Sequence, residues 1–126
     1  MYKRQPVREL LQATRKPYCI ENVVGSPLIN PVILCGTMFE LKTYRHRLFE
    51  TNFPVKQPVH PKHIAKTAKL GHPSNENEFM QIVGHFSGVD KARKVLNTPW
   101  MNRNEMSQCI PPAYSRYILE QFLTLG

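Results

Sequence analysis

One carboxylate and two guanidinium groups are the side chains of this sequence best suited to chemistry. Glu21 interrupts a run of strand-forming residues, 18–24 (YCIENVV), where a buried carboxylate without a partner would be costly. At the carboxyl end of a parallel strand it would instead point into the ligand crevice of an open α/β sheet. Arg45 and Arg47 follow in a segment, 43–51, whose start is too basic for an ordinary core strand. Taken alone, Glu21 fits better a strand-end ion pair, and the arginines fit better a solvated strand face.

A third segment near the C-terminus combines polar residues with a helix start. Residues 100–114 (WMNRNEMSQCIPPAY) contain Ser107 and Gln108 and reach Pro111-Pro112. Two prolines by themselves only indicate the first turn of a helix. Specificity therefore comes from the three segments together, in this order along the chain.

These three segments resemble the DNA cytosine-5 methyltransferase family, in particular its short, phage-type members. Residues 15–23 (RKPYCIENV) are similar to the motif that holds the target base, and 44–50 (YRHRLFE) to the Arg-x-Arg strand of the family. Residues 100–114 resemble the fused C-terminal motifs that end in Pro-Pro and a last helix. The resemblance covers residues 7–53 and 79–124.

The resemblance implies transfer of a methyl group from S-adenosylmethionine to C5 of a cytosine flipped out of double-stranded DNA. In the family a cysteine thiolate adds to C6, so that C5 can attack the methyl group, while an acid donates a proton to N3. Glu21 would be that acid, with Asn22 ordering the turn around it. Arg47 would stabilise the charge at O2 of the ring, and Arg45 would share that task or hold a phosphate.

Ser107 and Gln108 stand in the segment that lines the cofactor pocket of the family. The family usually has Gly-Asn at these positions, in a Gly-Asn-Ala-Val-Pro-Pro motif, so both residues depart from the pattern. The resemblance implies that Gln108 reaches the cofactor. Its plain alternative role is to cap the end of a helix.

The nucleophile and the cofactor loop of the family have no counterpart in the sequence. No Cys directly follows a Pro, and Gly-x-Gly does not occur. Both motifs lie N-terminal to Glu-Asn-Val in the family. Residues 1–5 (MYKRQ) are what a common sequencing-library transposon end encodes when it is read from a GTG start. We therefore expect a non-native leader at 1–5, a missing N-terminal half of the same enzyme, and a chain that is inactive alone.

The charge balance favours nucleic acid as the partner, with solubility or an acidic partner as the alternatives. The sequence has 17 lysines and arginines against 9 acidic residues, a net charge of +8. The basic segment 54–88 falls where the family varies most, in its target-recognition region, and its lysines would meet DNA phosphates. A histidine between glycines there would approach the flipped base, or belong to a plain turn. The candidate DNA-binding residues are Lys56, Lys62, Lys66, Lys69 and His85.

No metal site is expected. His60, His63 and His72 lie close together in the sequence, but no Cys or acidic residue lies within that cluster. The three cysteines are far apart, and their odd number argues against a disulfide framework. Free cysteines fit a cytoplasmic setting. No apolar run approaches the ~20 residues of a membrane span, and no signal peptide is visible.

Apolar periodicity and the positions of proline predict the elements. Helices are expected at 6–16, 88–97, 102–109 and 112–124, and strands at 18–24, 32–35, 43–51 and 79–84. The expected fold class is α/β, as the C-terminal half of a Rossmann-like class I S-adenosylmethionine-dependent methyltransferase with a basic, loop-rich insertion. Its parts would be core elements at 6–53, the insertion at 54–88 and closing helices at 89–126. Alone, such a sheet would be incomplete and poorly stable, with an exposed edge.

Two other functions stay open at this stage. One is a non-catalytic DNA-binding module that keeps a methyltransferase-like surface. The other is one subunit of a split methyltransferase, completed by a separate chain that carries the Pro-Cys loop. Neither the DNA target sequence nor the biological role, such as restriction or protection of a phage genome, follows from composition.

Overall fold

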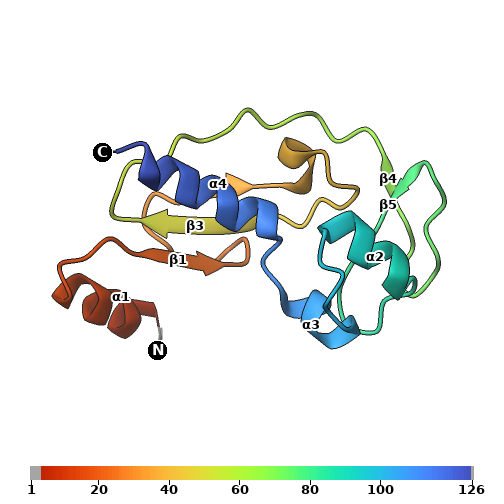
Figure 1. Ribbon diagram of the computed structural model, residues 1–126, viewed down its shortest axis with the longest axis horizontal. Helices are drawn as coiled ribbons and strands as arrows, with labels where there is room; N and C mark the ends of the chain where they lie inside the picture. Colours follow the sequence, from red (N-terminus) through yellow and green to blue (C-terminus); the bar gives the residue numbers. More distant parts are fainter. Residues whose placement is uncertain (1–3, 126) are drawn as a thin grey trace.

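A computed structural model describes residues 4–125, with side chains from residue 7 onward (Figure 1). Its helices are α1 (Arg4–Ala13), the 3-10 helix η1 (Gly36–Phe39), α2 (Val89–Leu96), α3 (Arg103–Gln108) and α4 (Pro112–Leu123). Its strands are β1 (Cys19–Asn22), β2 (Val32–Leu34), β3 (Arg47–Thr51), β4 (Lys66–Thr67) and β5 (Glu78–Phe79). The first three residues of the expected leader lie outside the described residues.

The main sheet has three strands in the order β1-β3-β2. The central strand runs antiparallel to both neighbours, with Ile20 opposite Glu50 and Ile33 opposite Leu48. Among the described residues the strand of Glu21 has no parallel neighbour, and the expected parallel pairing stays a prediction. The connection 35–46 returns the chain in the opposite direction, so β2 and β3 pair antiparallel. The described residues form a mixed α/β domain without a Rossmann pattern.

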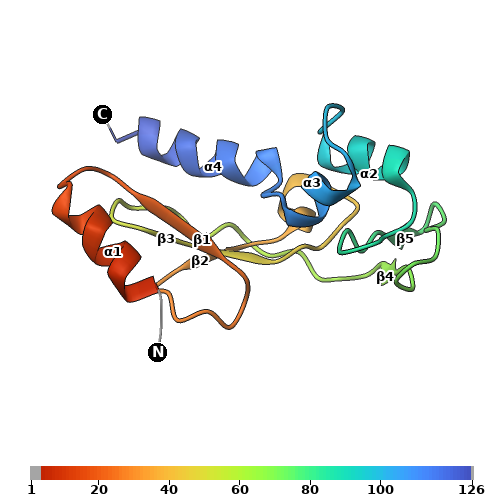
Figure 2. The same cartoon turned by 90° about the horizontal axis from the view of Figure 1, so that it is seen from below.

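One helix lies on each side of this sheet (Figure 2). Alternate side chains of a strand point to opposite faces, so Phe49 and Glu50 of β3 face different helices. Phe49 packs with Tyr114 and Ile118 of α4 in an apolar core. Glu50 instead meets α1 through Arg8.

A second apolar core lies between α2, α3 and the segment 80–86, away from the main sheet. It is formed by Met80, Ile82, Phe86, Ala92, Leu96 and Met106. The chain therefore buries its apolar side chains in two places. The contacts between the two cores therefore determine how α2 and α3 are placed relative to the main sheet.

The predicted helices are confirmed, because their signals are local. Asn102 and Glu105 form a capping box at the start of α3, and Pro112 occupies the first turn of α4. The strand predicted at 43–51 begins only at Arg47, because Arg45 has a φ of 38° that interrupts the extended backbone.

The basic segment after β3 is confirmed as a long loop. Residues 52–65 run the length of the main sheet to β4, which pairs in parallel with β5 (Figure 1). The strand predicted at 79–84 is limited to β5. No helix among residues 4–125 is long and apolar enough to cross a membrane.

Candidate functional site

The carboxylate and one of the two arginines singled out in the sequence lie in contact. Glu21 belongs to β1 and Arg47 to the paired strand β3. The Nε of Arg47 lies 3.5 Å from Oε2 of Glu21, and the two side chains are 18% and 28% exposed, respectively. An ion pair this long and this open contributes little to stability. Both groups therefore keep capacity to contact a third molecule.

Asn22 holds the backbone where β1 ends. Its Oδ1 accepts a hydrogen bond from the N–H of Val23 at 2.8 Å. Short polar side chains commonly fold back onto neighbouring N–H groups at strand ends. The contact orders the turn beside Glu21, the task that the resemblance implies for this residue.

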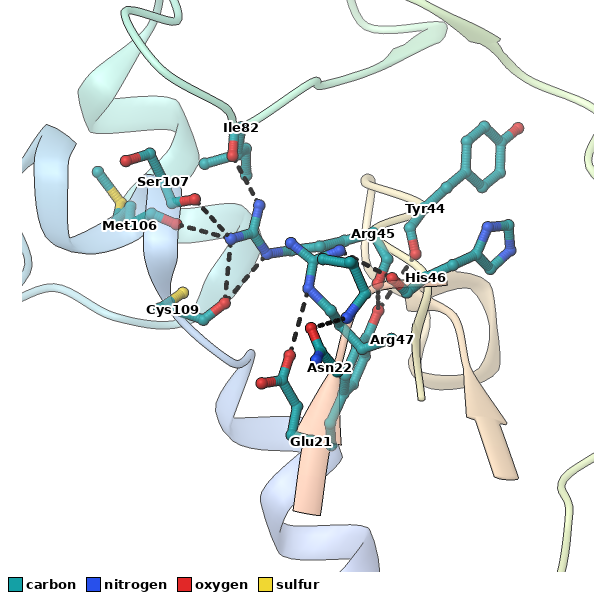
Figure 3. A network of polar contacts seen from close by, with 12 residues as sticks. Glu21, Asn22, Tyr44, Arg45, His46, Arg47, Ile82, Met106, Ser107 and Cys109 are labelled. Carbon is teal, nitrogen blue, oxygen red and sulfur yellow. Dashed lines mark hydrogen bonds and ion pairs between the residues drawn. The ribbon is translucent and has the colours of Figure 1, made fainter. Parts of the chain in front are cut away.

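Arg45 is buried, and its guanidinium donates only to backbone carbonyls (Figure 3). Its Nη1 donates to Ile82 at 2.6 Å, and its Nε donates to Cys109 at 3.1 Å. Its Nη2 donates to the carbonyls of Met106, Ser107 and Cys109. A cation at the C-terminal end of a helix is also favoured by the helix dipole. This geometry gives Arg45 a positioning task. Its expected share in stabilising the ring or holding a phosphate stays a prediction.

Tyr114 of α4 also contacts the backbone just before β3. Its hydroxyl donates to the carbonyls of Tyr44 and Arg45, at 3.1 and 2.9 Å. Burial raises the pKa of Tyr114 above its ordinary value. Burial, and then the neighbouring charge of Arg47, lower the pKa of Arg45. The start of β3 and the segment before α4 are thus held together from both directions.

Two hollows reach the Glu21–Arg47 pair from different sides. One, of about 540 Å³, lies between β1 and α4 and is lined by Glu21 among mostly apolar side chains. The other, of about 230 Å³, is lined by Arg45, Arg47 and the segment 80–83. Each member of the ion pair therefore borders a different hollow.

Ser107 and Gln108 make local contacts at the end of α3. Ser107 Oγ donates to the carbonyl of Asn104 at 2.8 Å, and Gln108 Nε2 lies 3.4 Å from Oδ1 of Asn104. These contacts match the helix-end role. A contact of Gln108 with a cofactor stays a prediction.

The candidate DNA-binding side chains are all exposed, so phosphates can reach each of them. They follow the loop 52–65, strand β4 and the loop before α2, on a long stretch of surface. The residues are Lys56, Lys62, Lys66, Lys69 and His85.

Four side chains that the sequence analysis did not group come together beside the start of β3. They are Cys35, His46, His60 and His63, whose donor atoms lie within 4.8 Å of one another. Burial and then neighbouring histidine rings lower the pKa of His46 and His63, which favours neutral imidazole. The missed signal was a cysteine and a histidine upstream of the His60/His63 pair.

A buried ion pair was also missed. Arg8 of α1 contacts Glu50 of β3, with Nε–Oε2 and Nη2–Oε1 distances of 2.8 Å. The hydrogen bond from Arg8 is the main cause that lowers the pKa of Glu50, against the effect of burial. No sequence spacing links these two residues, because one is helical and the other lies beyond two strands.

Comparisons were made with models of protein families, with curated proteins and with solved structures. None of the three comparisons gives a match to this chain. Function must therefore be inferred from the residues and their geometry.

Proposed function

We propose that this chain is the C-terminal part of a DNA cytosine-5 methyltransferase, which transfers a methyl group from S-adenosylmethionine to cytosine C5. The observation that carries the proposal is the convergence of the three segments of the resemblance. Glu21 of the first segment meets Arg47 of the second at 3.5 Å. Arg45 of the second segment donates to Ser107 and Cys109 of the third. The proposal requires these three segments to meet in space, and their contacts support it.

The Glu21–Arg47 pair supports a proton-transfer and charge-stabilising role at the cytosine ring. Glu21 would protonate N3 while the nucleophile adds to C6, and Arg47 would neutralise the charge that develops at O2. Two groups 3.5 Å apart match the neighbouring positions of N3 and O2 on one ring. Each group also borders a hollow, Glu21 the larger one and Arg47 the smaller one.

The open edge of β1 supports assembly with an N-terminal half. Among the described residues β1 pairs only with β3, so its other edge has free backbone donors and acceptors. Doubly wound sheets often include an antiparallel strand near one end of an otherwise parallel sheet. We propose that parallel strands carrying the cofactor loop and the Pro-Cys nucleophile continue the sheet beyond β1, as in a class I methyltransferase.

The net charge of +8 supports double-stranded DNA as the partner. The exposed lysines would contact phosphates and so would make binding fall steeply with salt. The loop-rich part, 54–88, would then carry target recognition, because it offers exposed polar groups on long loops.

The testing experiment measures methyl transfer from labelled S-adenosylmethionine to DNA. The chain alone is expected to transfer nothing, and the chain joined to the half encoded upstream of it is expected to be active. In the joined enzyme Glu21→Gln should lower turnover by about 10²–10⁴-fold, the usual contribution of a general acid. Glu9→Gln, at an exposed position of α1, is the matched control and should be neutral.

Two outcomes would contradict this proposal. Methyl transfer by the chain alone would remove the need for a second half, and unchanged turnover of the Glu21→Gln enzyme would remove Glu21 from the mechanism. A Pro-Cys loop in an adjacent gene would identify a split enzyme. Tight binding of unmodified duplex DNA, with no Pro-Cys loop encoded nearby, would instead favour the non-catalytic DNA-binding module.

A further inference from the structure

Four nitrogen and sulfur donors converge between the main sheet and the long basic loop. Cys35 follows β2, His46 precedes β3, and His60 and His63 come from the loop 52–65. Their donor atoms lie within 4.8 Å of one another. The Cys35 Sγ–His63 Nε2 distance is 3.4 Å and the Nε2–Nε2 distance between His46 and His60 is 3.1 Å. Ligands on a tetrahedral zinc ion lie about 3.3–3.8 Å apart. The two short pairs are close to that spacing, and separations of up to 4.8 Å would close by about 1 Å around such an ion.

The hydrogen bond of His60 directs a lone pair into this cluster. Its Nδ1 lies 2.6 Å from the carbonyl oxygen of Pro61, which can only accept. In the neutral ring the proton therefore resides on Nδ1, and the lone pair of Nε2 faces the Nε2 of His46 at 3.1 Å. Histidines that bind metals typically donate their other N–H to a carbonyl or carboxylate in this way.

Second contacts hold the other ligands in place. Cys35 is fully buried, and the Thr37 hydroxyl donates to its Sγ at 3.1 Å. A donor aimed at sulfur stabilises a thiolate. The ring of His63 stacks on Tyr44 at a centroid distance of 3.8 Å, and the Tyr44 hydroxyl donates to the Ala65 carbonyl. The cluster is thus oriented by its surroundings as well as by its own contacts.

We propose that Cys35, His46, His60 and His63 bind one zinc ion. The donor set contains one thiolate and three imidazoles and no carboxylate, which favours zinc over the hard cations magnesium and calcium. The four protein ligands complete a tetrahedral shell and leave no position for substrate, which is typical of a structural site. The proposal stands independently of the proposed methyltransferase function.

Such an ion would anchor the part of the loop around His60 and His63, which apolar packing does not hold. Val59 and Ile64 flank the two loop histidines and are each 89% exposed. Hydrogen bonds hold the loop on both sides of this part: Gln57 bonds the backbone of Ile33 in β2, and the Tyr44 hydroxyl donates to the Ala65 carbonyl. The backbone of Lys56 also bonds side chains of α4. A zinc ion would join residues 60–63 to both ends of the 35–46 connection. It would thereby fix the neighbouring Lys62 over the sheet and steady the segment that leads into Arg47.

The test is the metal content of the full 126-residue chain, purified without chelators. Elemental analysis should give one zinc per chain. Replacement by Co²⁺ should produce intense visible bands of a tetrahedral site and a sulfur-to-cobalt band in the near ultraviolet. The doubly substituted His60→Ala/His63→Ala chain should retain less than a tenth of the zinc. The matched control His72→Ala/His85→Ala, at exposed histidines outside the cluster, should retain all of it.

Cysteine variants locate the sulfur ligand. Cys35→Ser should abolish the sulfur-to-cobalt band, whereas Cys19→Ser and Cys109→Ser should keep it. Because Cys35 is buried and its variant can fail to fold, the exposed His60 and His63 provide the decisive comparison. Chelation should lower the Tm of the wild-type chain and leave that of His60→Ala/His63→Ala unchanged. A wild-type chain that binds no zinc after saturation and dialysis, or full zinc in His60→Ala/His63→Ala, overturns the proposal.

Discussion

Two ion pairs meet on β3, and they differ in almost every physical respect. Arg8 and Glu50 are buried, with side chains 5% and 3% exposed and an Nε–Oε2 distance of 2.8 Å. Arg47 and Glu21 are partly exposed and lie 3.5 Å apart. The two carboxylates belong to neighbouring strands of one sheet. The same two types of side chain, arginine and glutamate, therefore stabilise the packing in one pair and remain accessible to a ligand in the other.

The two carboxylates differ in the number of further hydrogen-bond partners, which explains why one pair is structural and the other accessible. Glu50 also accepts hydrogen bonds from the N–H of Ile29 at 2.7 Å and from the hydroxyl of Tyr18 at 3.4 Å. Both of its oxygens are thus satisfied within the protein, and removing one partner leaves a buried charge. Within residues 7–125, Glu21 has its ion pair with Arg47 as its one polar side-chain contact, and it borders a hollow. A satisfied carboxylate stabilises a fold, whereas one with spare acceptors and space beside it is suited to bind.

The largest effect is expected from breaking the buried pair. Arg8→Met should lower the free energy of unfolding by about 3–5 kcal/mol, because Glu50 would be left buried without its main partner. Arg116→Met, which removes an exposed ion pair with Glu120, is the matched control and should cost less than about 0.5 kcal/mol. Urea unfolding at neutral pH measures both. Equal losses in the two variants would contradict the contrast between the pairs.

Loss of the Arg45 guanidinium should have the next largest effect. Arg45→Met would leave the carbonyls of Ile82 and Cys109 without their donor, at a cost of about 3 kcal/mol. Arg45→Lys should restore little of this free energy, because one ammonium group cannot donate to all the carbonyls that the planar guanidinium reaches. Unfolding free energies of the two variants test this positioning role. A fully stable Arg45→Lys chain would show that the fork is not needed.

Acid should weaken the buried pair. The pKa of Glu50 is held below its ordinary value of 4.5, chiefly by the hydrogen bond from Arg8. Its stabilisation is therefore fully present above the ordinary carboxyl pKa and is lost as the pH falls through the lowered pKa of the folded state. The difference in unfolding free energy between wild type and Glu50→Gln should shrink between about pH 5 and about pH 3. A difference that stays constant over this range would contradict the assignment.

The smallest effect on stability is expected at the open pair. Glu21→Gln should change the free energy of unfolding by less than about 1 kcal/mol, because the pair is partly solvated and long. The matched comparison is Glu50→Gln on the adjacent strand, measured by the same unfolding experiment. If Glu21→Gln proved as destabilising as Glu50→Gln, the open pair would be structural too, and its place in the proposed chemistry would be lost.

Local signals predicted much of the helical structure. Proline in a first turn and a capping box act within one turn of backbone, so α3 and α4 follow from their own residues. The pairing of Glu21 with Arg47 was anticipated only through the motif order, since the two residues are separated by a strand and two loops. The metal-ligating cluster escaped prediction because its four residues lie on separate segments.

The sequence by itself determined the helices, the positions of β1, β2 and β3, the basic loop and the identity of the polar residues available for chemistry. These depend on backbone preferences and on patterns within a few residues. Only the tertiary structure decided that β1 pairs antiparallel with β3 and that Arg45, at a φ of 38°, turns inward. It also decided that the carboxylate of Glu50 is buried while that of Glu21 is partly exposed. The physical reason is that burial and partner number depend on segments distant in the chain. Two guanidinium groups two residues apart can therefore have opposite tasks.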